Sequence, residues 1–229
     1  QMCIRDRPDT DWHVPRLYDF LADMPASTIT ANHSRYVVDV NRFSQGSVLY
    51  PGQSETEVCP TTTFTEQDIY LSGKAPHKAQ IQSRIKAYWQ PYHDALAAQL
   101  KRIKAIHGYA LLWDAHSIAS EVPRFFTGTL PDLNLGTAEG LSCQTDIGNQ
   151  LFLLMQQSQF SAVRDSRFKG GYITRHYGYP QGHIHAVQME IAQNAYMEEH
   201  GDNVYDESKA AKLSKVLSTM VSKLSHYKL

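Results

Sequence analysis

The sequence has few cysteines and no long apolar run, and each shortage excludes a class of protein. Its 229 residues include three cysteines, at positions 3, 59 and 143, and no Cys-x-x-Cys pair. We therefore expect neither a disulfide framework nor a thiolate zinc site. The low cysteine content is typical of a protein of the reducing cytoplasm. The longest apolar runs fall far short of the ~18 residues of a membrane span, so we expect a soluble protein without membrane contact.

Charge and sequence motifs exclude further classes. The formal net charge is −1, and no basic stripe suggests nucleic-acid binding. No Gly-x-Ser-x-Gly elbow and no phosphate-cradling glycine loop occur, which disfavours a serine esterase or a nucleotide-binding protein. With 11 histidines against three cysteines, any metal is expected to have nitrogen and oxygen ligands. We interpret four histidines as ordinary surface or packing residues: His93, His107, His200 and His226.

Helical and strand patterns alternate along the chain. We expect helices over 11–23, 78–106 (divided at Pro91), 145–157 and 206–225, and strands over 27–33, 35–41, 109–116, 160–165 and 184–192. This alternation predicts a layered α/β/α domain. The segment 43–76 is rich in Gly, Pro, Ser and Thr, and we expect it to be irregular and to cover a site.

The strand over 109–116 ends in titratable groups. Strand alternation puts Leu112, Asp114 and His116 on one face. A histidine held on a strand end beside a carboxylate can act as a metal ligand or a general base. The segment is also compatible with a capped strand end whose histidine is only hydrogen-bonded.

The strand over 184–192 carries an acid in an otherwise apolar run. Gln188 and Glu190 share one face, whereas His183 and His185 lie on the other. An acid in this setting must be paired, bound to a metal or held with a raised pKa, and a general base needs the same setting. The alternative is an exposed edge strand.

Basic and amide side chains cluster at the end of the strand over 35–41. Asp39 and Asn41 share a face there, and Arg42 follows directly. Two arginines and an asparagine suit an anionic, amino-acid-like substrate, because a guanidinium group matches a carboxylate bidentately. The alternative is a salt bridge between Asp39 and Arg35 or Arg42.

Eight strings, in order, resemble the N-formylglutamate amidohydrolase family. They are PDTDWHVPRLYDF (8–20), SRYVVDVNR (34–42), LYPGQSETEVCPTTTF (49–64), YWQPYHDAL (88–96), HGYALLWDAHSI (107–118), LPDLNLGT (130–137), RFKGGYITRHYG (167–178) and QMEIAQNAYM (188–197). The resemblance implies a zinc-carboxypeptidase-like, three-layer α/β/α fold with a mixed central sheet. It also implies zinc-dependent hydrolysis of N-formyl-L-glutamate to formate and L-glutamate, a step of histidine degradation.

The resemblance further implies a zinc site. His116 looks like one ligand, and an acid of the Asp9-Thr10-Asp11 string looks like another, with Asp11 favoured over Asp9. Glu190 looks like the base that activates water at the metal. Asp114 is expected to orient a metal-binding side chain or a neighbouring group without binding the metal itself.

Substrate-binding residues are implied in the same way. Asn41 and Arg42 match an Asn-Arg pair that holds substrate carboxylates in related metallohydrolases, with Arg35 and Asp39 in support. Candidates for the second carboxylate or the oxyanion are Arg175 and His176.

The first seven residues, QMCIRDR, resemble a translated transposon-end sequence used in sequencing-library preparation. We therefore exclude residues 1–7 from fold reasoning and treat residues 8–229 as one amidohydrolase domain. The family carries near its start a Pro-His-x-Gly-type string that this sequence does not match. We expect this chain to lack the first strand and one of three zinc ligands, and hence to bind zinc poorly.

Two other functions stay open at this point. One is a deacylase of another N-acyl amino acid, such as an N-acetyl or N-succinyl derivative. The other is a non-catalytic binder of small anionic amino acids through Arg35, Arg42 and Arg175. The sequence does not indicate an oligomeric state.

Overall fold

A computed structural model describes residues 8–46, 52, 54–199 and 201–227, so the segment 1–7 lies outside the described residues. Within them, a four-stranded sheet has the order β1-β4-β2-β3. Its strands are β1 (Ala110–Ile118), β2 (Leu133–Gly136), β3 (Ala162–Arg164) and β4 (Ile184–Ala192). β1 is parallel to β4, β2 is antiparallel to β4, and β3 is parallel to β2. The sheet is therefore mixed, as the sequence analysis expected.

The two long strands of the sheet, β1 and β4, lie side by side. The predicted strands over 109–116 and 184–192 are confirmed as β1 and β4. Their parallel register places His116 opposite Glu190. Because β4 has β1 and β2 as neighbours, it is an interior strand, and the alternative that Glu190 lies on an exposed edge is wrong.

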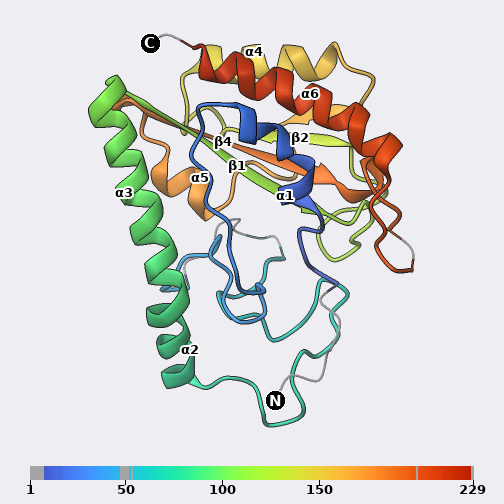
Figure 1. Ribbon diagram of the computed structural model, residues 1–229. Helices are drawn as coiled ribbons and strands as arrows, with labels where there is room; N and C mark the ends of the chain where they lie inside the picture. Colours follow the sequence, from blue (N-terminus) through green and yellow to red (C-terminus); the bar gives the residue numbers. More distant parts are fainter. Residues whose placement is uncertain (1–7, 47–51, 53, 200, 228–229) are drawn as a thin grey trace.

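Helices pack against both faces of the sheet (Figure 1). One face carries α1 (Val14–Leu17), α4 (Thr145–Gln156) and α6 (Glu207–Ser225), and the other carries α3 (Gln90–His107) and α5 (Tyr172–Tyr177). Short 3-10 turns lie after α1 (Asp19–Asp23), after α5 (Pro180–Gly182) and after β4 (Gln193–Ala195). In the described part of the chain, no helix combines the length and apolar character that a membrane crossing needs.

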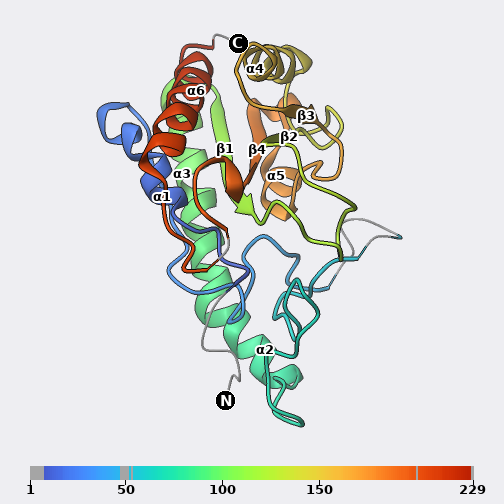
Figure 2. The same ribbon diagram turned by 90° about the vertical axis from the view of Figure 1, so that its right-hand side faces the viewer.

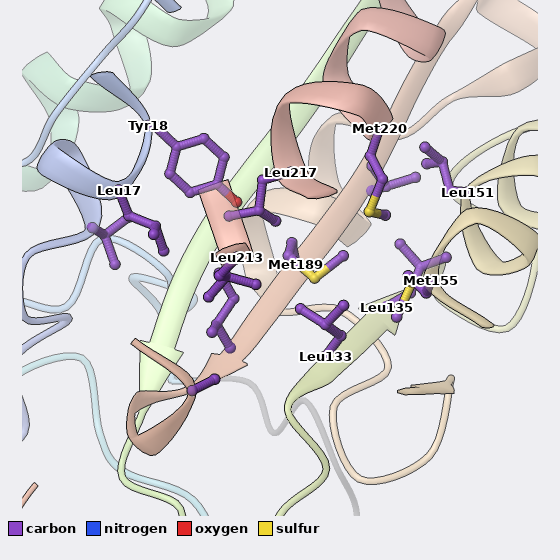
Figure 3. Packing of buried hydrophobic residues seen from close by; sticks show 14 of the residues in the cluster. Leu17, Tyr18, Leu133, Leu135, Leu151, Met155, Met189, Leu213, Leu217 and Met220 are labelled. Carbon is purple, nitrogen blue, oxygen red and sulfur yellow. The ribbon is translucent and has the colours of Figure 1, made fainter. Parts of the chain in front are cut away.

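The largest apolar cluster lies between the sheet and the helices α4 and α6 (Figure 3). Its central side chains are Leu133, Leu135, Leu151, Met155, Met189, Leu213, Leu217 and Met220. The helical period of the sequence after residue 206 predicted this buried stripe of α6. Asp206 caps the helix by accepting hydrogen bonds from the backbone of Ser208 and Lys209. The cluster therefore buries the side chains of one face of β4.

The predicted helix over 78–106 is confirmed, with its irregularity next to Pro91. It consists of α2 (Lys78–Arg84), a π-helical turn (Ile85–Trp89) and α3, and it ends at Gly108, whose φ is 83°. Proline has no N–H and its ring crowds the preceding turn, so the wider π turn accommodates it. Gly108 adopts the left-handed conformation that a helix C-cap often needs.

Several predicted elements are wrong. Residues 27–33 and 35–41 form turns and irregular backbone instead of strands. Asp39 accepts a hydrogen bond from the backbone N of Asn41, and Ser34 Oγ accepts one from Tyr36 N, so local side-chain contacts replace strand pairing. The predicted helix over 11–23 shortens to α1 and a 3-10 turn. The predicted loop before residue 144 contains β2, which is four residues long and has no readable period.

The long irregular segment lies beyond the ends of β1 and β4. In both views the light blue to teal part of the chain, which leads into α2, lies below the sheet (Figures 1 and 2). Part of the predicted excursion 43–76 lies outside the described residues. Its described part includes Ser54, Glu55 and Phe64, which line a pocket together with residues of the two strands.

Candidate active site

A pocket opens at the carboxyl ends of the parallel strands β1 and β4, which is where ligands bind in many α/β sheets. His116 comes from β1 and Glu190 from β4. Arg35, Asn41 and Arg42 come from the irregular segment that covers these strand ends. Asp39 also lines the pocket, so the structure brings together six of the residues that were selected from the sequence.

His116 is held between two carboxylates. Its Nδ1 lies 3.0 Å from Asp11 Oδ2, and its Nε2 lies 2.9 Å from Asp114 Oδ1. Burial opposes protonation of the imidazole, but Asp114 and Asp11 outweigh it and hold the pKa of His116 well above its ordinary value. Thr174 Oγ1 donates to the other oxygen of Asp114 at 3.1 Å. The histidine is therefore fixed at both ring nitrogens.

Arg35 joins two acids beside this cluster. It donates to Asp11 Oδ1 at 3.1 Å and lies 3.6 Å from Asp39 Oδ2, with its guanidinium over the ring of Phe64. Burial disfavours its charge, but Asp39 and Asp11 raise the pKa of Arg35 above its usual range. Burial also acts to raise the pKa of Asp11, yet Arg35 and His116 lower it below its ordinary value. Asp11 is therefore ionised at neutral pH.

Glu190 has a different environment. It is 7 % exposed, and burial raises its pKa to about 7, although the charge of His116 acts in the opposite direction. Gln188 Nε2 donates to Glu190 Oε2 at 3.1 Å. A carboxyl group with this pKa exchanges a proton readily near neutral pH.

Asn41 and Arg42 line the pocket and also form hydrogen bonds to the backbone of neighbouring segments. Asn41 Oδ1 accepts the backbone N–H of Ile173, and its Nδ2 lies 3.0 Å from His116 Nε2. Arg42 donates through Nε to the carbonyl of Thr56 at 3.0 Å. Both residues therefore combine a structural contact with a position on the pocket lining.

Other predicted residues lie away from the described lining. Arg175 donates to the carbonyl of Gly170, and His176 stacks on Tyr172 with ring centroids 4.8 Å apart. Burial lowers the pKa of His176. Neither residue is part of the pocket lining, so a substrate role for them stays a prediction.

The structure also separates the two acids near the start of the described chain. Asp11 contacts His116, whereas Asp9 Oδ2 accepts the backbone N–H of Phe64 at 2.9 Å. Burial raises the pKa of Asp9. The nearby His13 lies 2.7 Å from the carbonyl of Asn203, through Nε2. Asp11 is therefore the acid of this string that faces the histidine.

Part of the pocket wall was not predicted from the sequence. Arg167 and three aromatic residues, Phe64, Phe125 and Phe168, complete the lining. Arg167 Nε donates to the carbonyl of Phe125 at 2.6 Å. Arg167 belongs to the string 167–178 that carries the family resemblance, but no role was predicted for it. The three phenylalanines carry no local pattern that marks a pocket.

The donors near His116 fit part of a zinc site. Asp11 Oδ2 and His116 Nδ1 face one another, and a carboxylate behind the second ring nitrogen, here Asp114, is a common support of a metal-binding histidine. Catalytic zinc usually has three protein ligands. Within residues 8–46, 52, 54–199 and 201–227, no group of three His, Cys, Asp or Glu side chains is arranged to hold a metal. Among the described residues, Asp11 and His116 are thus the two side chains placed where they could bind a metal.

Comparison with known proteins gives a consistent picture. The sequence matches the N-formylglutamate amidohydrolase family over residues 4–197. It is 48% identical over 198 residues to the N-formylglutamate deformylase of Pseudomonas aeruginosa, covering 86% of this chain and 74% of that protein. It is 44% identical over 221 residues to the N-formylglutamate deformylase of Pseudomonas putida, covering 96% of this chain and 82% of that protein.

A solved structure agrees at the level of the fold. The crystal structure of an N-formylglutamate amidohydrolase from Ralstonia eutropha JMP134 superimposes with a TM-score of 0.83 at 21% identity, covering 99% of this chain and 87% of that one. At this identity the likeness shows the fold alone. From the sequence match and the two bacterial relatives, the chain belongs to the N-formylglutamate amidohydrolase family.

Proposed function

We propose that this chain hydrolyses the amide bond of N-formyl-L-glutamate and releases formate and L-glutamate. The observation that carries the proposal is its 44–48% identity to two proteins named N-formylglutamate deformylase. The pocket supports it, because a buried carboxyl group, a histidine paired with carboxylates and arginine side chains meet at one strand end. These are the groups that hydrolysis of an anionic amide requires.

Zinc is part of the proposal. Asp11 and His116 would hold the ion, with Asp114 fixing the imidazole through Nε2. When bound, zinc supplies Lewis acidity, which polarises a carbonyl oxygen and lowers the pKa of water. His116 must release its Nδ1 proton to bind a metal, so zinc affinity should increase with pH. Because two ligands are fewer than the usual three, we expect weak binding by the described residues alone.

Glu190 is the proposed general base. Its pKa of about 7 leaves a substantial ionised fraction at neutral pH, which can accept a proton from the attacking water. The same carboxyl group then delivers the proton to the nitrogen of the departing glutamate. Burial is the cause of this pKa, so the activity depends on the pocket excluding solvent around Glu190.

Arginine side chains are the proposed holders of the substrate's carboxylates. Arg42 lines the pocket, and Arg35 is kept charged by Asp11 and Asp39. Arg167 provides a third guanidinium group on the lining. A dianionic substrate held at both carboxylates would present only its small formyl group to His116 and Glu190.

The family resemblance extends the proposal to cellular context. We propose a zinc-carboxypeptidase-like arrangement of the layers and a place in histidine degradation. The cysteines within the described residues, Cys59 and Cys143, are free and buried, which supports the proposed cytoplasmic location.

Release of L-glutamate from three substrates tests this function. N-formyl-, N-acetyl- and N-succinyl-L-glutamate share the two carboxylates of glutamate and differ in the acyl group, and each is assayed with added zinc and with chelator. We expect zinc-dependent turnover of the formyl compound to exceed release of glutamate from the other two. Faster hydrolysis of an acetyl or succinyl compound would replace the proposal by a different deacylase. Binding of all three without turnover would indicate a non-catalytic binder.

A further inference from the structure

The side chain of Gln188 connects the backbone of a neighbouring loop to Glu190. Gln188 is 3 % exposed and lines the pocket two residues before Glu190 on β4. Its Oε1 accepts the backbone N–H of Gly171 at 2.6 Å, and its Nε2 donates to Glu190 Oε2 at 3.1 Å. The amide thus bridges two groups that come from different parts of the chain.

The backbone of Gly171 fixes which way this amide faces. A backbone N–H is only a donor, so the atom of Gln188 that meets it must be the carbonyl oxygen. The NH2 group is then directed at Glu190. A Cβ atom at position 171 would lie 2.4 Å from Asn41 Nδ2, so a larger residue there would displace the Asn41 side chain.

A carboxylate held through one oxygen loses rotational freedom. Glu190 has a flexible side chain, and a general base must keep its carboxylate plane directed at the water that it deprotonates. A hydrogen bond to a charged acceptor is stronger than a neutral one, and burial strengthens it further. The contact from Gln188 is therefore suited to fixing the orientation of the carboxylate.

We propose that Gln188 is a positioning residue that, anchored by the backbone of Gly171, holds the carboxylate of Glu190 in its working orientation. This proposal rests on the function proposed above, in which Glu190 is the base. It differs from a substrate-binding role because Gln188 uses both ends of its amide within the protein.

Two variants and a matched control separate the possible roles. Gln188→Met keeps the length of the side chain and removes both hydrogen bonds. Gln188→Glu keeps an acceptor for Gly171 but has no N–H to donate to Glu190. The control is His185→Asn, which changes another buried polar residue of β4 whose Nδ1 accepts the backbone N–H of Gln144, away from the pocket lining.

Formate release by the full chain with added zinc is measured for each variant, together with its melting temperature. We expect both Gln188 variants to lose roughly 10- to 100-fold in kcat with KM changed by less than about threefold, since a charge-assisted hydrogen bond is lost. His185→Asn should lower the melting temperature and retain kcat. Unchanged kcat in Gln188→Met, or a rise in KM that accounts for the whole loss, would overturn the proposal.

A crystal structure of Gln188→Met beside the wild-type protein gives an answer that does not depend on turnover. The proposal predicts that the Glu190 carboxylate rotates or occupies several conformations in the variant. A carboxylate that keeps its wild-type position would overturn the proposal. If the wild-type chain releases no formate, the proposed function fails, and the crystal comparison alone decides the role of Gln188.

Discussion

Two carboxylates near His116, Asp11 and Glu190, have pKa values displaced in opposite directions. Burial acts to raise both, but Asp11 contacts Arg35 and His116, whereas Glu190 accepts a hydrogen bond from the neutral amide of Gln188. A carboxylate that stays ionised suits a cation, and one that titrates near pH 7 suits proton transfer. Their neighbours therefore favour different roles for two chemically similar side chains.

His93 shows what a sequence pattern cannot reveal about a single residue. From the sequence it was interpreted as an ordinary surface or packing histidine, and its 4 % exposure agrees with the packing alternative. Its Nε2 lies 2.8 Å from the carbonyl of Val40, and its Nδ1 lies 2.9 Å from the hydroxyl of Tyr177. Both partners are far away in sequence, so only the folded chain shows this environment.

Burial lowers the pKa of His93 to about 4, and this makes stability depend on pH. Between about pH 6.5 and pH 4 the unfolded chain binds a proton that the folded chain excludes, so the free energy of unfolding decreases as the pH falls through this window. The loss from this group should reach roughly 3 kcal/mol at the acidic end. Urea unfolding of the wild type and of His93→Gln from pH 7.5 to 4.5 measures it.

The variant should lose less stability over this pH range than the wild type, whatever its stability at pH 7.5. His226→Gln is the matched control, because His226 is exposed and lies at the end of α6. A His93→Gln variant with the same pH dependence as the wild type would contradict the assigned environment.

At the scale of elements, long periodic segments were more predictable than short ones, although the short strand β3 was expected over 160–165. The apolar runs of β1 and β4 and the helical period of α6 were read correctly, because burial of their side chains follows directly from spacing. β2 has only four residues, and its pairing with β4 depends on a strand about 50 residues later in the sequence. Residues 35–41 have strand-like composition but lie in turns held by Asp39 and Ser34.

Gly136 at the end of β2 tests how closely this strand packs on the loop before α5. A Cβ atom there would lie 2.6 Å from the backbone N of Gly170 and 2.8 Å from the backbone C of Lys169. We expect Gly136→Ala to cost about 3 kcal/mol of unfolding free energy, because backbone atoms must move. Urea unfolding at pH 7.5 measures the loss.

Gly108→Ala is the comparison for that experiment. Gly108 has a φ of 83° and open space around its Cα, so alanine there carries only the conformational cost of about 1 kcal/mol. The account of β2 is wrong if Gly136→Ala costs no more than Gly108→Ala.

For the whole molecule, the pocket depends on segments that the sequence keeps far apart. It combines Phe125 with residues of 35–42, 54–64, 116–118, 167–171 and 188–190. The sheet brings β1 and β4 together (Figure 1). The irregular segment supplies Arg35 and Arg42 to the pocket at their ends. His116, Glu190 and Arg42 could be selected from the sequence because each stands in a distinctive string. Gln188 and Arg167 gained a role only from their contacts in the folded chain.

The central claim is that this pocket hydrolyses N-formyl-L-glutamate with Glu190 as the base. The most direct test is steady-state formate release by the wild type and by Glu190→Gln, with zinc and with chelator. Glu198→Gln, which alters an exposed acid paired with Lys209, is the control. The account predicts zinc-dependent release by the wild type and the control, and a loss of roughly 100- to 10,000-fold in kcat for Glu190→Gln. Glu190→Gln turning over as fast as Glu198→Gln would contradict it.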